Sequence, residues 1–300
     1  MSLIDALIHP AATRRAPIPA EESALIRIRA GCTHPALFYA WRDRDDNARQ
    51  AMIHNERGGS GRAAFLLLHG LGATGAVWAD LSARIEATGL GRWIVVDLPG
   101  HGASDRCELY SIGRFAADLA PLVADEQRAF VVGHSLGAYI ALALASGWFR
   151  VRVAGVLGIG PKITWTEADL QGVRDLAARP PRDFATEAEA IERYRRVSGL
   201  DAGFAGPDVL ARGVMRTGRG YGLAADPRTM LVAGASFATL ASSATCPVIL
   251  ARGEHDPMVS LAELRDHATD ALDVAGRGHN AHVEDSQAVA ALCERLVRRT

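Results

Sequence analysis

The sequence predicts an α/β protein in which helices cover an open, mostly parallel β-sheet. Short, continuous apolar runs recur along the chain, as is typical of parallel strands that are buried on both faces. Helical patterns lie between these runs, in the alternation that builds a parallel sheet. The chain has 300 residues, of which 49% are hydrophobic, so it can form one large domain or a domain with an insertion.

We expect eight strands in a mostly parallel sheet. The first of them alternates apolar and polar residues and suits an edge strand. The glycine-rich stretch Gly58–Gly61 indicates a loop rather than an interdomain linker. The expected strands are Leu25–Ala30, Ala36–Trp41, Gln50–Asn55, Ala63–Gly70, Arg92–Gly100, Ala129–Ser135, Val153–Gly160 and Pro247–Asp256.

Four helical patterns accompany these strands. Three carry one apolar stripe each, marked by Val77–Ile85, Ile112–Leu122 and Val289–Leu296. The fourth, Leu136–Phe149, is apolar on all sides, as a helix enclosed in a core would be.

Residues 161–236 interrupt this alternation with helical signals and no clear buried strand. Thr186 and Glu189 form a capping-box pattern, and Gly199 suits the far end of that helix. Asp226-Pro227 is typical of another helix start. We therefore expect residues 161–236 to form a helical cap inserted into a core domain, whose two parts are residues 1–160 and 237–300.

Composition gives no support for a nucleic-acid or membrane partner. The net charge of −1 gives no electrostatic reason to expect nucleic acid or an anionic membrane. The N-terminus lacks a signal-peptide pattern, and no apolar run reaches the ~18–20 residues of a membrane span. We expect a cytoplasmic monomer or homodimer. Lys162 is the only lysine among 33 basic residues, which we interpret as compositional bias.

The stretch Phe130–Ala145 places a serine where a buried strand turns into a buried helix. Gly133, Ser135 and Gly137 form a G-x-S-x-G pattern, which in this context predicts a nucleophile elbow. The glycines permit a tight turn that lifts the Ser135 hydroxyl out of the core. The helix N-terminus below it offers N–H groups to a developing negative charge.

A serine nucleophile needs a base and an orienting carboxylate. Asp256 ends a late strand, and His279 precedes the last helix, so the chain order is serine, aspartate, histidine. An earlier strand ends in an H-G-x-G pattern whose backbone could supply an oxyanion donor. We predict that the Leu71 and Leu136 N–H groups form the oxyanion hole.

Together these motifs resemble the α/β-hydrolase fold enzymes, from about Ala63 to Thr300. The resemblance implies Ser135 as nucleophile, Asp256 as acid and His279 as base, with no cofactor and no metal. The motifs, in family order, are H-G-L-G at His69–Gly72, D-L-P-G-H-G-A-S at Asp97–Ser104, G-H-S-L-G at Gly133–Gly137, the Asp256 segment and Gly278–His279.

Other residues compete for these roles. His282 is the main rival for the base, and Glu254 and Asp285 are rivals for the acid, although Asp285 suits a helix cap better. His279 and His282 form an H-x-x-H pair, but this pair with Asp256 is only a weak indication of a metal site. The pair lacks a third ligand at the spacing that metal sites show. The four cysteines also lack metal-ligand spacing, so we expect reduced thiols.

Four further polar residues near the motifs have structural interpretations. We expect His69 to shape the oxyanion loop, Asp97 and His101 to organise a turn, and His134 to pack beneath the elbow.

The fold alone does not fix the substrate. Serine at the elbow argues against the dehalogenases and epoxide hydrolases of the family, which use aspartate there. Leu136 argues against the perhydrolases, which often have methionine at that position. A carboxylic ester or related acyl substrate is the expected substrate, with a lactone or a ring-cleavage dienone as alternatives. A small-ligand receptor that retains the triad is the alternative without catalysis.

Overall fold

The computed structural model describes residues 51–200 and 205–300. The strands expected at Leu25–Ala30 and Ala36–Trp41 lie outside the described residues. Within the described residues, no helix is long and apolar enough to span a membrane.

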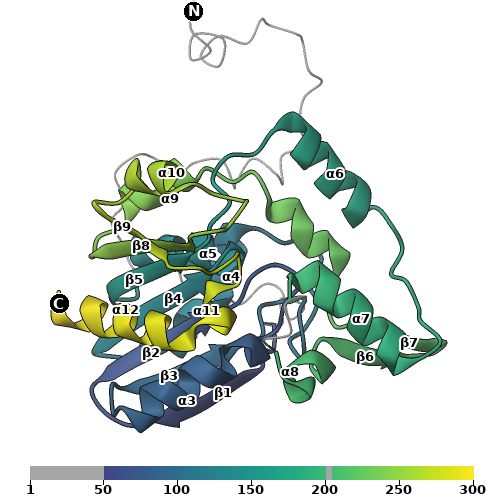
Figure 1. The fold of residues 1–300 in the computed structure, drawn as a ribbon, viewed down its shortest axis with the longest axis horizontal. Coiled ribbons are helices and arrows are strands. Elements are labelled where there is room, and N and C mark those ends of the chain that lie inside the picture. The colour runs from purple at the N-terminus through teal and green to yellow at the C-terminus, as the bar shows by residue number, and fades with distance from the viewer. Residues whose placement is uncertain (1–50, 201–204) are drawn as a thin grey trace, which may run out of the picture. The chain divides into compact units, whose positions relative to one another are not determined.

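A seven-stranded sheet forms the centre of the fold, in the order β1-β3-β2-β4-β5-β8-β9 (Figure 1). Only β1 is antiparallel to its neighbour; the other pairs are parallel. The predicted fold class is therefore confirmed. The strands are β1 (Asn55–Gly59), β2 (Ala63–Leu68), β3 (Arg92–Val96), β4 (Arg128–His134), β5 (Val153–Ile159), β8 (Val248–Gly253) and β9 (Asp270–Val274).

Two edge strands differ from the expectation. Residues 51–54 are not a strand, and β1 instead includes Gly58 and Gly59, which we expected in a loop. Glycine fits at position 58 because the Trp93 indole covers it; an added Cβ would lie 2.3 Å from the ring. The second strand, β9, was not expected, because its D-A-L-D-V sequence is partly polar and lacks a continuous apolar run.

Helices cover both faces of the sheet (Figure 1). Alternate β2 residues enter opposite cores: Leu66 and Leu68 pack with α4 and α5, whereas Phe65 and Leu67 share a core with residues of α3 and α12. The core helices and 3₁₀ turns are η2 (Gly75–Trp78), α3 (Ala79–Ala87), α4 (Ile112–Leu119), η3 (Ala120–Leu122), α5 (Leu136–Ala145), α9 (Phe237–Ser243), α10 (Leu261–Arg265), α11 (Ala281–Glu284) and α12 (Ser286–Arg298).

Residues 161–236 connect β5 to α9 and β8. They contain α6 (Glu167–Ala177), α7 (Glu187–Ser198), α8 (Pro207–Ala211), β6 (Val214–Thr217), β7 (Gly220–Leu223) and η4 (Pro227–Val232). The insertion contains helices, as expected, and also a hairpin that was not expected, in which β6 and β7 pair antiparallel. These short strands are mostly half-buried and carry no continuous buried apolar run, so no strand signal is visible in their residues.

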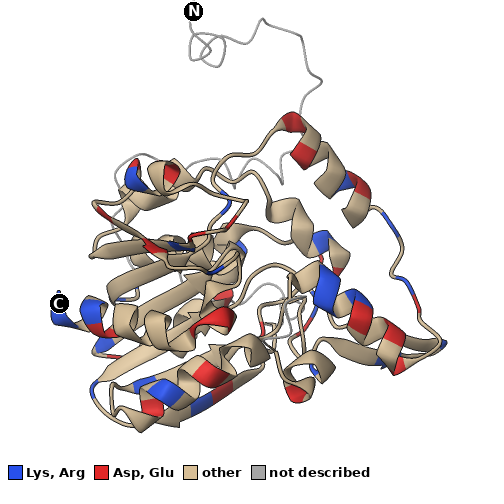
Figure 2. Cartoon of the chain, viewed as in Figure 1, with Lys and Arg blue, Asp and Glu red and all other residues tan. Residues whose placement is uncertain are grey.

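The ends of α7 follow the predicted capping chemistry. Thr186 and Glu189 make both bonds of the capping box, and Gly199 closes the helix in the left-handed conformation. Acidic residues lie at the N-terminus of α7 and basic residues at its C-terminus (Figure 2), an arrangement that favours the helix dipole.

Candidate active site

Ser135 lies in the turn between β4 and α5, with φ 49° and ψ −110°. A non-glycine residue at positive φ is strained, and such strain persists only where the surroundings enforce it. Here the Ser135 N–H donates to the Ile159 carbonyl at 2.8 Å, which ties the turn to the end of β5. The backbone thus presents the serine at the carboxyl end of the parallel sheet.

The two glycines of the motif are required by close backbone contacts. A Cβ on Gly133 would lie 2.2 Å from the Gly137 carbonyl carbon, and a Cβ on Gly137 would lie 2.2 Å from the Leu68 carbonyl oxygen. Any side chain at either position would force α5 away from β4 or β2.

His279 and Asp256 meet on the loops that follow β9 and β8. Their Nδ1 and Oδ2 atoms are 2.9 Å apart. The Asp256 side chain is fully buried, whereas 21% of the His279 side chain is exposed. The Met258 N–H donates to the other carboxylate oxygen of Asp256 at 2.8 Å. Arg252 donates to the Asp256 carbonyl at 3.1 Å and so holds the loop from the opposite side.

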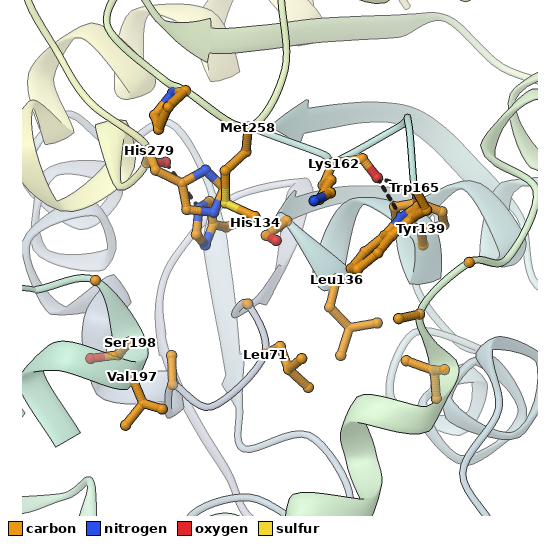
Figure 3. Close-up of a pocket in the computed structure, with 18 of the residues that line it drawn as sticks. Leu71, His134, Leu136, Tyr139, Lys162, Trp165, Val197, Ser198, Met258 and His279 are labelled. Atoms are coloured by element: carbon orange, nitrogen blue, oxygen red, sulfur yellow. Dashed lines mark hydrogen bonds between the residues drawn. The ribbon is translucent and has the colours of Figure 1, made fainter. Parts of the chain in front are cut away.

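Ser135 and His279 line the same cavity, which has a volume of about 380 Å³. Figure 3 shows His279 and Met258 on one side of this cavity and Tyr139 and Trp165 on the other. Asp256 does not line it, so the structure places the carboxylate behind the histidine.

Leu71 and Leu136 also line the cavity. Leu136 is the first residue of α5, so its N–H lies at a helix N-terminus. Among the described residues, neither N–H group has a hydrogen-bond partner. Two backbone donors are therefore available near the serine.

Comparison with known proteins identifies the family. Residues 65–292, about three quarters of the chain, match the alpha/beta hydrolase family. This chain belongs to the alpha/beta hydrolase family. A stretch of 80 residues is 40% identical to the pimeloyl-[acyl-carrier protein] methyl ester esterase of Vibrio atlanticus, and covers 27% of this chain and 30% of that enzyme.

The other similarities concern a short segment or the fold. Over 92 residues, this alpha/beta hydrolase is 38% identical to an uncharacterised Mycobacterium tuberculosis protein; the match covers 29% of the chain and 26% of that protein. The matched part of this chain thus spans about a quarter of the length of the first curated relatives. The structure of E-2-(acetamidomethylene)succinate hydrolase has a TM-score of 0.67 at 22% identity, covering 83% of this chain and 96% of that one.

The rival residues lie elsewhere in this alpha/beta hydrolase. His282 is buried, and its ring lies between Trp78 and His134, with centroid distances of 4.4 and 4.2 Å. Asp285 caps α12 by accepting from the Ala288 N–H. Glu254 is exposed and accepts from the Gly276 N–H. The part of the chain that the structure describes contains no cluster of residues that could hold a metal ion.

Buried polar groups hold the loops around the cavity. The Gly72 N–H donates to His101 Nε2 at 3.1 Å, and the Leu98 N–H donates to His69 Nε2 at 2.9 Å. Asp97 accepts from the N–H groups of Gly75 and Ala103 at 2.7 and 2.9 Å. These contacts connect the H-G-L-G loop to the loop after β3, which is the kind of role expected for these side chains.

The insertion contributes residues that sequence reasoning did not assign to the site. Val197, Ser198 and Gly199, at the end of α7, line the cavity together with Lys162. Asn280 Nδ2 donates to the carbonyls of Ser198 and Gly199 at 3.1 and 2.8 Å. Because Asn280 directly follows His279, the histidine loop is fastened to α7. The one sequence signal was Gly199, whose left-handed conformation was expected but whose place at the cavity was not.

Proposed function

We propose that this alpha/beta hydrolase cleaves a small-molecule carboxylic ester, or a related acyl substrate, through a covalent acyl-enzyme on Ser135. The observation that carries the proposal is the strained Ser135, which opens into the same cavity as a His279 that is bonded to a buried carboxylate. A strained serine at a strand-helix turn is the arrangement that exposes a nucleophile.

The proposed chemistry follows from these positions. Asp256 accepts the Nδ1–H of His279, so the Nε2 atom is free to take the proton of the Ser135 hydroxyl. The serine oxygen attacks the acyl carbon, and the carbonyl oxygen becomes an oxyanion. The Leu71 and Leu136 N–H groups stabilise this oxyanion. His279 then gives the proton to the leaving alcohol, and water releases the acid by the same route in reverse.

Residues 161–236 act in this proposal as a cap over the cavity. Residues just before α6, at the end of α7 and at the end of η4 contribute cavity walls, which supports a role in substrate choice. A cap at the carboxyl end of a parallel sheet lies where ligands of such sheets bind. Similarity to the Vibrio methyl ester esterase supports ester cleavage over cleavage of a C–C bond.

Substitution of the serine tests the proposal. Ser135→Ala should lower the turnover of 4-nitrophenyl acetate by roughly 10⁴-fold, because the covalent route is lost. A fluorophosphonate should label wild-type protein at Ser135, as located by peptide mass spectrometry. Ser242→Ala, at an exposed serine of α9, is the matched control and should behave as wild type.

Two results would contradict the proposal. Retention of activity in Ser135→Ala would exclude the serine as nucleophile, and labelling at another residue would do the same. Tight binding of a substrate panel of aryl esters, lactones and dienones without turnover would favour a receptor.

A further inference from the structure

Lys162 is the only lysine of the chain, and its side chain lines the cavity beside Ser135 and His279. It comes just after β5, at the start of the insertion. Its carbonyl accepts hydrogen bonds from the Tyr139 hydroxyl at 2.5 Å and from Trp165 Nε1 at 3.0 Å. The backbone of Lys162 is therefore held from the core and from the insertion at once.

The ammonium group of Lys162 has two partners on the protein. Its Nζ lies 3.0 Å from Asp169 Oδ2 and 4.7 Å from the centroid of the Trp165 ring. Only 20% of the side chain is exposed. An ammonium group has three N–H donors, so a third direction is left for another group. In Figure 3 the nitrogen end of Lys162 points toward the middle of the cavity.

Asp169 also helps to cap the N-terminus of α6. Its carboxylate accepts from the Thr166 N–H at 3.0 Å and completes the capping box of that helix. The pKa of Asp169 is lowered to about 2, first by the hydrogen bond from the Thr166 backbone and then by Lys162. The carboxylate is therefore ionised at neutral pH, and it does not line the cavity.

The cavity wall contains positive charge without negative charge. No Asp or Glu is among the lining residues of the described chain, whereas Lys162 and Arg196 both are. Arg196 donates to Glu192 at 3.0 Å and is largely exposed. Most other lining residues are apolar or glycine. An apolar site with one half-buried ammonium group favours an anion that brings its own apolar chain.

We propose that the substrate carries a free carboxylate, which binds Lys162 while the ester carbonyl lies at Ser135. The substrate class would be the monoesters or monothioesters of short dicarboxylic acids. The inference rests on the proposed function, because it names the substrate of the same site. The carboxylate shares the ammonium group with Asp169 and receives its third donor, in a place where little water competes.

A pair of esters of equal size tests this assignment. The 4-nitrophenyl monoester of glutaric acid carries a terminal carboxylate, and the corresponding ester of glutaramic acid carries a neutral amide of the same shape. For wild type, kcat/KM should be at least about tenfold higher for the acid, the difference expected of one charge-assisted hydrogen bond. Esters of succinic and adipic acid then measure the preferred chain length.

Three variants make the test specific to Lys162. Lys162→Met should lower the ratio of the two kcat/KM values to about one. Asp169→Asn should raise the ratio above that of wild type, because the competing carboxylate is gone while the amide oxygen can still cap α6. Arg174→Met, which removes a positive charge from the exposed side of α6, should keep the wild-type ratio.

Lys162→Met and Asp169→Asn should change the kcat/KM ratio in opposite directions, which distinguishes substrate recognition by Lys162 from a purely structural ion pair. If Lys162 only fastens α6, Lys162→Met and Asp169→Asn should change both esters equally and leave the ratio at its wild-type value, which would overturn the proposal. A wild-type ratio near one would overturn it too, while hydrolysis of both esters would leave the proposed function standing.

Binding gives a readout that does not need turnover. Calorimetry on Ser135→Ala should show tighter binding of the glutaric monoester than of its amide counterpart, and Lys162→Met in that background should remove the difference. If wild type cleaves neither ester but this difference is present, the proposed function fails and the assignment of Lys162 stands. Equal binding of the two esters overturns the assignment.

Discussion

Acid should destabilise this protein steeply, because four of its histidines are buried. His69, His101, His134 and His282 are at most 4% exposed. Burial lowers the pKa of His69 to about 4 and the pKa values of His101 and His282 to about 3. Burial also holds the pKa of His134 well below its usual value. All four rings are therefore neutral in the folded protein at pH 7.

The direction of the pH effect follows from these shifts. In the unfolded chain a histidine has a pKa near 6.5, which is above each folded value. Below about pH 7 the unfolded state therefore binds protons that the folded state does not, so the unfolding free energy falls as pH falls. The loss continues until the pH reaches the folded pKa values, near 4 for His69 and near 3 for His101 and His282.

The expected loss is large compared with the total stability. Between pH 7 and pH 5 each such histidine costs about 2 kcal/mol of unfolding free energy. Three of them, His69, His101 and His282, together cost about 6 kcal/mol, whereas a domain is stable by about 5–15 kcal/mol. The buried His134 adds to this loss. We therefore expect acid unfolding to begin near pH 5.

Urea unfolding, followed by circular dichroism at half-unit steps from pH 7 to pH 5, measures this slope. His282→Phe is the informative variant, because neither His282 ring nitrogen has a hydrogen-bond partner among the described residues. An apolar ring should keep or raise the stability at pH 7. It should also reduce the mean slope between pH 7 and pH 5 by about 1 kcal/mol per pH unit, the contribution of one such histidine.

A matched control excludes a general effect of removing a histidine. His255 is exposed, so His255→Gln should leave the slope as in wild type. An unfolding free energy that stays constant from pH 7 to pH 5.5 would refute the reasoning, and so would a His282→Phe variant with the wild-type slope.

Three further predictions concern the site. Gly137→Ala should lower the unfolding free energy by about 3 kcal/mol in urea titrations, because its Cβ would overlap the Leu68 carbonyl; wild-type stability would contradict the close contact. Asp256→Asn should lower kcat by roughly 10⁴-fold, and a loss below tenfold in steady-state kinetics would exclude this carboxylate as the orienting acid. Asn280→Ala should cost about 2 kcal/mol and speed proteolysis between α6 and α8, because two hydrogen bonds to α7 are lost; an unchanged cleavage rate would show that this contact does not fasten the insertion.

The predictable part of the fold is the part that is buried on both faces. Strands such as β2 and β4 are continuous apolar runs because helices cover both sides, and that pattern is visible in the sequence. The edge strand β9 and the β6–β7 hairpin face solvent on one side, so their polar residues hide the strand signal. Pairing with a neighbour, rather than local sequence, fixes these strands.

The candidate site divides in the same way. The elbow and the histidine loop are set by a few adjacent residues, such as Gly133 to Gly137. Short motifs therefore indicated Ser135 and His279 as candidates, and the structure places both in the wall of one cavity. The cavity wall depends on how α7 and η4 pack against the core, and no local pattern encodes that packing. Lys162 shows the difference, since composition suggested bias, whereas its contacts with Asp169 and Trp165 place it in the cavity.

The hydrogen bonds of the buried histidines also specify which nitrogen carries the proton. His69 Nε2 accepts from the Leu98 N–H, so its Nδ1 carries the hydrogen and donates to the Gly70 carbonyl at 2.7 Å. His101 Nε2 accepts from the Gly72 N–H, and its Nδ1 faces the Pro99 carbonyl in the same way. A second proton on either ring would turn its Nε2 atom into a donor that faces a backbone N–H donor, so that hydrogen bond would be lost.

The hydrogen bonds that such a proton would disturb belong to the H-G-L-G loop, which carries the proposed oxyanion donor Leu71 between Gly70 and Gly72. Protonation of His101 would remove the acceptor of the Gly72 N–H and so disturb this loop. The donor geometry at Leu71 therefore depends on a neutral ring that the chemical step never touches. Because the pKa of His101 is about 3, the ring stays neutral at pH 5, where we expect unfolding to begin. The donor geometry at Leu71 should therefore hold for as long as the protein is folded, so the buried histidines connect the stability of this fold to the function proposed for its cavity.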